Sequence, residues 1–148
     1  MPLCRLVYKS QTSWDILSNE VLQKLAINSE RRNRENGITG LLVLSGETFL
    51  QVLEGESEPV NQLYRNIIQD KRHQDVTLIS YESISQRSFE DWGMRVADLN
   101  DLPIASRDFL RSKYPEQEGY IEIPDDTPKA LALLFDVRVL CLSEPGTC

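Results

Sequence analysis

The sequence has few of the residues from which enzyme active sites are usually built. His73 is the only histidine, and the charged run around it, residues 70–75, contains no nucleophile. We therefore expect His73 to be a solvated loop residue. Glu54 and Glu56 form a pair of acids, but their side chains should diverge after the preceding strand, which disfavours an acid/base couple. No GxGxxG or Walker-type glycine pattern is present, which disfavours a Rossmann cofactor site.

Cysteines and long apolar runs are also scarce. Cys4, Cys141 and Cys148 have no repeated spacing, so they predict neither a disulfide framework nor a zinc site, and we interpret them as free thiols in a reducing compartment. No stretch approaches the roughly 18 apolar residues that cross a bilayer, and the N-terminus lacks the apolar region of a signal peptide. These absences predict a soluble, cytoplasmic protein.

Positive charge is in the minority. Asp and Glu number 23 against 16 Lys and Arg, which gives a net charge of -7 and argues against a large nucleic-acid surface. The 148 residues are 41% hydrophobic and 26% charged, which is ordinary for a globular chain. That length predicts one domain with a modest accessory segment.

The hydrophobic pattern alternates between strands and helices. Helical spacing is expected from Ser18 to about residue 33 and from Ser57 to about residue 70, with each serine as an N-cap. Period-two alternation or short apolar runs predict strands at residues 3–8, 38–44, 48–53, 76–83 and 93–97. The order β-α-β-β-α-β-β predicts an α+β, ferredoxin-like sheet with both helices on one face.

The remainder of the chain predicts a helical extension. We expect a helix over 101–114, then a connection rich in Pro, Glu and Gly, then a nearly all-apolar helix over 127–142. Residues 1–99 should therefore be one domain, and residues 100–148 an extension for oligomerisation or signalling.

Two polar residues lie within apolar rows of the predicted sheet. Tyr8 shares a face with Cys4 and Leu6, and Gln51 shares a face with Phe49 and Leu53. In the predicted topology the two strands are neighbours, so Tyr8 and Gln51 could meet. A buried amide or phenol needs a partner, because leaving it unsatisfied costs roughly 1–3 kcal/mol. The residues alone allow simple structural pairing or one wall of a ligand site.

Four segments together resemble the BLUF family of blue-light photoreceptors, in the same order and at similar spacing. The resemblance covers about residues 1–99 and is greatest for the short, stand-alone members. It is carried by residues 5–8 (RLVY), 32–42 (RNRENGITGLL), 49–55 (FLQVLEG) and 89–94 (FEDWGM).

The resemblance implies a flavin bound noncovalently between the two helices. The expected cofactor is FAD, with FMN or riboflavin as alternatives. Apolar contact would come from Leu25, Ile38 and Ile67, and polar contact with the ring from Ser29 and Asn33. The implied cofactor-binding residues are Leu25, Ser29, Asn33, Ile38, Phe49, Gln51, Arg65, Ile67, Asp70 and Arg72.

The sequence departs from the family pattern at two positions. Arg32 stands where short members often have a second asparagine, and Asn66 stands where an arginine often holds the ribityl-phosphate tail. Arg65, Lys71 or Arg72 would then replace that contact, and Asp70 would bind the sugar chain.

The resemblance also implies a mechanism. Light would drive an electron and a proton from Tyr8, and recombination would leave the Gln51 amide rotated or tautomerised, which strengthens its hydrogen bond to the flavin and shifts the absorption to the red. Trp92 and Met94 match the segment that passes this change outward. Simple packing is an alternative role for both side chains.

The chain contains no recognisable effector enzyme, so we expect output through contacts with other proteins. The expected partners are further copies of the chain, in a ring assembly such as a decamer, and a response-regulator-like protein. Two other hypotheses remain open at this point. One is an acylphosphatase-like enzyme, although Tyr8-Lys9-Ser10-Gln11 stands where such enzymes have a glycine-rich loop. The other is an interaction domain without a chromophore.

Overall fold

A five-stranded sheet forms the centre of the molecule. The computed structural model describes residues 2–12 and 19–143. The strands are β1 (Leu3–Gln11), β2 (Thr39–Ser45), β3 (Thr48–Glu56), β4 (Gln74–Ile84) and β5 (Arg95–Asp98), in the spatial order β4-β1-β3-β2-β5. Neighbouring strands are antiparallel except β2 and β5, which are parallel. The predicted ferredoxin-like α+β fold is confirmed.

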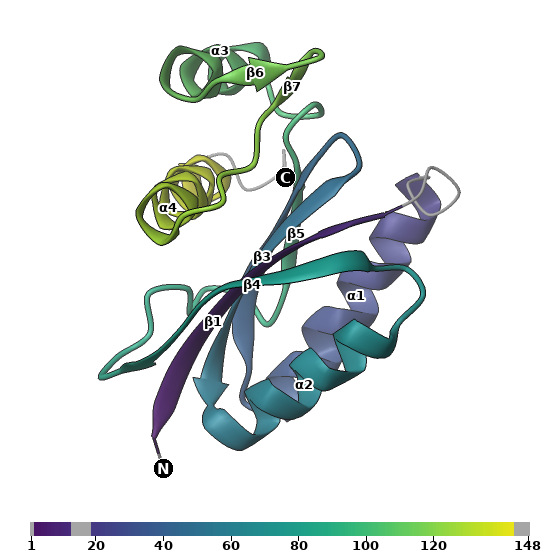
Figure 1. Ribbon diagram of the computed structural model, residues 1–148, viewed down its shortest axis with the longest axis vertical. Helices are drawn as coiled ribbons and strands as arrows, with labels where there is room; N and C mark the ends of the chain where they lie inside the picture. Colours follow the sequence, from purple (N-terminus) through teal and green to yellow (C-terminus); the bar gives the residue numbers. More distant parts are fainter. Residues whose placement is uncertain (1, 13–18, 144–148) are drawn as a thin grey trace.

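The first two helices, α1 (Asn19–Glu35) and α2 (Ser57–Gln69), lie on the same face of the sheet (Figure 1). Helix α1 runs past its expected end near residue 33 and is followed by Gly37 in the left-handed region, where a residue without Cβ is favoured. The predicted cap at Ser57 is wrong, because β3 leads directly into the helix and Glu56 takes the cap position. The predicted cap at Ser18 lies outside the described residues.

The C-terminal part covers the opposite face of the sheet (Figure 1). It comprises α3 (Ile104–Lys113), β6 (Glu116–Gln117), β7 (Tyr120–Ile121) and α4 (Thr127–Ser143). Helix α3 begins three residues later than expected, after Pro103 at its cap position. The hairpin of β6 and β7 was not predicted. Its turn places both Glu118 and Gly119 at positive φ, which suits a tight two-residue connection.

Strand alternation divides the buried side chains into two core clusters, one on each face of the sheet. Leu6, Tyr8 and Leu53 pack towards α1 and α2. Val7 and Val52 face the other way and pack with Leu133 of α4. Because both faces of the central strands are covered, β2 and β3 are buried along nearly their whole length.

Cysteine chemistry matches the expectation only in part. Cys4 is free, as predicted, and is buried, whereas Cys141 is disulfide-bonded, so the interpretation of all three cysteines as free thiols is wrong. Of the helices that the structure describes, none is long and apolar enough to cross a membrane. Residues 2–12 and 19–143 also contain no group of three or more His, Cys, Asp or Glu side chains placed to hold a metal ion.

Candidate functional site

Tyr8 and Gln51 face each other across the centre of the sheet. The antiparallel register of β1 and β3 places the two residues directly opposite one another. The Tyr8 hydroxyl donates a hydrogen bond to Oε1 of Gln51, and both side chains are buried. Burial raises the pKa of Tyr8 far above its ordinary value, so the phenol remains a protonated donor. The expectation that this pair could meet is confirmed.

The Gln51 amide also reaches the segment before β5. Its Nε2 donates to the Sδ atom of Met94 at 3.2 Å, and Met94 is almost fully buried. Trp92 instead packs against the core on the α4 side, with the Arg95 guanidinium 5.2 Å from its ring centroid. The sequence could not decide which of the two side chains faces the site. In the structure it is Met94.

A cavity of about 280 Å³ is lined by residues of α1 and α2, with Gln51 of β3 in its wall. Its lining combines apolar side chains with amides, a hydroxyl and charged groups at different points. The lining residues are Leu25, Ser29, Arg32, Asn33, Asn36, Ile38, Leu42, Gln51, Pro59, Gln62, Leu63, Asn66, Ile67, Asp70, Arg72, His73, Met94 and Val96.

The structure brings most of the predicted cofactor residues together in this cavity. Leu25, Ser29, Asn33, Ile38, Gln51, Ile67, Asp70 and Arg72 all line it. Phe49 and Arg65 do not. Phe49 is buried beside the cavity and packs against His73, with 5.4 Å between ring centroids. Arg65 is exposed, and its Nη2 donates to Gln62 on the same helix at 2.9 Å.

His73 lines the cavity, although the sequence predicted a solvated loop residue. It is half-buried and lies with its ring centroid 6.1 Å from that of Tyr8. Its Nδ1 atom is 2.9 Å from the Ser10 hydroxyl. Burial lowers the pKa of His73, which favours the neutral ring. The run 70–75 suggested solvent, and only the pairing of β4 with β1 reveals the contact.

Asp70 and Arg72 form an ion pair at the cavity. The Arg72 guanidinium donates to both carboxylate oxygens of Asp70, with the shortest distance 2.6 Å. These hydrogen bonds lower the pKa of Asp70 to about 2. Arg32 and Asn66, the two departures from the family pattern, also line the cavity. The Nε atom of Arg32 makes a long hydrogen bond of 3.4 Å to the Asn28 carbonyl.

A family model and several known proteins match the sequence of the chain. The family model described as "BLUF: Sensors of blue-light using FAD" matches residues 3–95. The chain is 34% identical over 97 residues to the blue light- and temperature-regulated antirepressor BluF of Escherichia coli strain K12, a match covering 66% of this chain and 24% of the antirepressor. It is 31% identical over 101 residues to the photoactivated adenylate cyclase subunit beta of Euglena longa, covering 68% of this chain and 12% of that subunit.

Solved structures agree with these sequence matches. The dark-state structure of BlrB, a BLUF protein, is 28% identical with a TM-score of 0.65, and the match covers 95% of this chain and 96% of BlrB. The photo-activated state of BlsA is 30% identical with a TM-score of 0.63, over 74% of this chain and 77% of BlsA. The family model and these likenesses show that the chain belongs to the BLUF family, the sensors of blue light using FAD.

Proposed function

We propose that the chain is a blue-light photoreceptor that holds FAD noncovalently in the cavity between α1 and α2 and signals through Tyr8 and Gln51. One observation carries the proposal. A continuous chain of hydrogen bonds runs from the Tyr8 hydroxyl through the Gln51 amide to the Met94 sulfur, and both Gln51 and Met94 line the cavity.

The cavity lining has the chemistry that a flavin requires. Apolar side chains such as Leu25, Ile38 and Ile67 suit the faces of a planar ring. Polar groups at the edge, including Ser29 and Asn33, suit ring carbonyl and N–H groups, since hydroxyls and amides both donate and accept. When bound, the flavin supplies blue-light absorption and an electron acceptor.

The charged residues at the same cavity suit the phosphate-bearing tail of FAD. Arg32 and Arg72 supply guanidinium groups, which match phosphate geometry, and Asp70 offers carboxylate oxygens to hydroxyl groups. Arg72 already donates to Asp70, so Arg32 is the more available cation. We assign the phosphate contact to Arg32 and not to Arg65, because Arg32 lines the cavity and Arg65 does not.

Tyr8 and Gln51 perform the switch through the direction of their hydrogen bonds. The Tyr8 hydroxyl proton already points at Gln51 Oε1, so that oxygen is the first acceptor on the proton's path. An amide has a donor end and an acceptor end, and rotation or tautomerisation exchanges them. The exchange removes the donor that now faces the Met94 sulfur and thereby changes the contact between β3 and the segment before β5.

Output then depends on contacts with other proteins in the cytoplasm, without catalysis by this chain. We propose residues 1–99 as the photosensory domain and 100–148 as the extension for assembly and signalling. Helix α4 supports this division because it packs on the sheet with one side and exposes Val139 and Leu142 on the other. The proposed partners are other copies of the chain in a ring assembly and a response-regulator-like protein.

The test is a visible spectrum of the purified full chain before and after blue illumination. A yellow protein with a small, reversible red shift is expected, and Gln51→Ala should abolish that shift while the flavin stays bound. A flavin-loaded protein without a shift, or a normal shift in the Gln51→Ala variant, contradicts the proposal. Colourless protein with phosphatase activity would instead favour the acylphosphatase-like hypothesis.

A further inference from the structure

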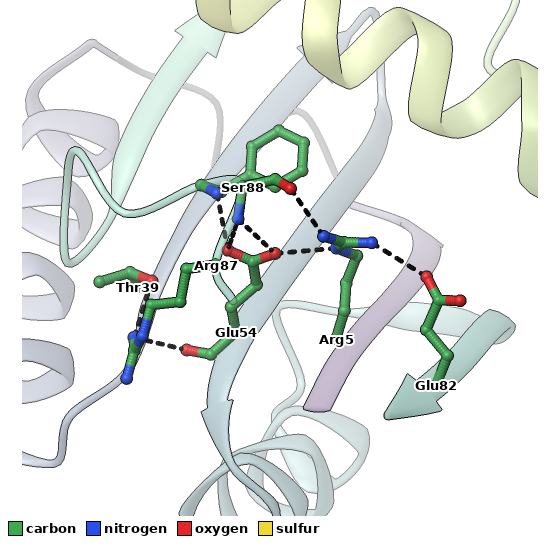
Figure 2. A network of polar contacts seen from close by, with 7 residues as sticks. Arg5, Thr39, Glu54, Glu82, Arg87 and Ser88 are labelled. Carbon is green, nitrogen blue, oxygen red and sulfur yellow. Dashed lines mark hydrogen bonds and ion pairs between the residues drawn. The ribbon is translucent and has the colours of Figure 1, made fainter. Parts of the chain in front are cut away.

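Glu54 of β3 has a buried carboxylate, which accepts hydrogen bonds from Arg5 and from the backbone of one loop. Its side chain is fully inaccessible, and it accepts hydrogen bonds from Arg5 Nε at 2.8 Å and from the backbone N–H groups of Ser88 and Phe89, at 2.9 Å and 2.6 Å (Figure 2). Burying a charge is costly unless it is paired and hydrogen-bonded, and here both conditions are met. Glu56, its expected companion, is exposed.

The loop held by Glu54 is the irregular segment 85–94 between β4 and β5, which we call the β4–β5 segment. Arg87 supplies a second attachment of this segment to the sheet. Its Nη1 donates to Thr39 Oγ1 at 2.8 Å and to the Glu54 carbonyl at 3.1 Å (Figure 2), and its Nη2 donates to the Gly37 carbonyl at 2.7 Å. Residues 87–89 are therefore fixed to β2 and β3.

The far end of the β4–β5 segment lies at the cavity. Met94 accepts the Gln51 hydrogen bond, its own N–H donates to Glu30 Oε2 at 2.7 Å, and the neighbouring Gly93 carbonyl accepts from Asn33 Nδ2 at 3.0 Å. A Cβ on Gly93 would lie only 2.4 Å from the Glu30 carbonyl oxygen, so the segment passes α1 at very close range.

The middle of the same segment contacts α4 on the opposite face of the sheet. The Phe89 ring stacks on Phe135, with 4.9 Å between centroids. Asp91 accepts from Arg138 Nε at 2.7 Å, in an ion pair whose side chains are only about a quarter exposed. Four residues, 90–93, connect the fixed residues 87–89 to Met94, so this connection is short.

We propose that Glu54 is a positioning residue that fixes one end of this connection, so that a displacement of Met94 at the cavity is delivered to α4 through Asp91 and Arg138. If residues 87–89 were not fixed, the β4–β5 segment could rearrange when Met94 moves, and α4 would not be displaced. The inference rests on the proposed light-driven change at Gln51. It adds a structural role for the Glu54–Arg5 pair, neither member of which lines the cavity.

The experiment compares hydrogen exchange of the full, FAD-loaded chain in darkness and in blue light, for the wild type and four variants. Glu54→Gln keeps the shape of the side chain but removes its charge. Glu82→Gln is the matched control, because Glu82 is the exposed partner of the same arginine, at 3.0 Å from Arg5 Nη1. Asp91→Asn removes the charge and one of the two acceptors from the last step only. Arg5→Lys is a milder second variant in case Glu54→Gln fails to fold.

In the wild type, light should change the exchange of peptides from α4. Glu54→Gln should keep the red shift but lose most of the light-induced change in α4, and the Ser88 and Phe89 amides should exchange about tenfold faster in darkness. Arg5→Lys should show the same two effects more weakly. Asp91→Asn should lose the α4 response while keeping those amides protected, and Glu82→Gln should match the wild type.

Two results overturn the inference: a full α4 response in the Glu54→Gln variant, or a wild type whose spectrum shifts without any change in α4. A wild type that shows no spectral shift contradicts the proposed function instead. In that case the dark-state exchange of Ser88 and Phe89 still decides, independently of light, whether Glu54 positions the β4–β5 segment.

Discussion

The two faces of the central sheet are built from the same strands but enclose different kinds of interior. Towards α1 and α2, the buried set includes Tyr8, Gln51 and Asn33, and the helices leave a cavity between them. Towards α4, the interior is built mainly from aliphatic and aromatic side chains, with Val7 and Leu133 among those fully buried, and the buried Glu54 carboxylate on this side is fully paired. Strands β1 and β3 therefore serve a polar cavity and a mainly apolar core at once, because successive side chains point to opposite faces.

The largest expected effect is on the cavity face. Tyr8→Phe removes only the hydroxyl that donates to Gln51, so the red shift should disappear while the flavin remains bound and the fold is retained. Light-minus-dark absorption spectroscopy measures the shift. Val7→Ala, at the neighbouring position on the other face, is the control and should retain the shift. A Tyr8→Phe variant with an undiminished shift would break the assignment of the switch to this face.

Substitutions in the core towards α4 should lower the free energy of unfolding and leave the spectral shift unchanged. Leu133→Ala on α4 removes a fully buried side chain, which typically costs about 2–5 kcal/mol of unfolding free energy. Urea unfolding of the dark form measures this loss, and the spectral shift of the folded variant should be unchanged. Leu142→Ala, on the exposed side of the same helix, should change stability by less than about 1 kcal/mol. Equal losses from both leucines would contradict the packing described here.

Much of this contrast between faces could be predicted from the sequence. Alternation along β1 and β3 is a local property, so the faces of Tyr8 and Gln51 follow from counting residues. The contacts of His73 and Glu54 are not local. His73 reaches Ser10 only because of how β4 pairs with β1, and Glu54 is satisfied by backbone groups more than thirty residues away. Register between distant strands and the path of an irregular segment leave no periodic signal in the sequence.

Acid should weaken the cavity face through Asp70. Its pKa is lowered to about 2 from an ordinary value of 3.8, chiefly by the hydrogen bonds from Arg72. The unfolded chain therefore takes up this proton more readily, and the stabilisation, complete above pH 3.8, is lost as the pH falls towards 2. Urea unfolding at a series of pH values measures the slope. Asp70→Asn should flatten it.

The smallest effect concerns His73. Burial lowers its pKa below the ordinary 6.5, so the unfolded chain binds the proton first and stability should decline as the pH falls below 6.5. Because the ring is only partly buried, the slope should be slight. His73→Gln should remove it, as measured by thermal unfolding between pH 5 and 7. A variant with the same slope as the wild type would show that His73 does not titrate as described.

Strand β5 has a consequence for how such a sensor resets. It is four residues long, lies at the edge of the sheet, and is paired with β2 alone. Displacing β5 disturbs the short set of backbone hydrogen bonds between β5 and β2 and leaves the remaining strand pairs intact. The free-energy difference between two positions of β5 therefore depends on this part of the sheet alone. A short edge strand of this kind can be displaced and can return by thermal motion, without opening the pairs that β1, β3 and β4 make.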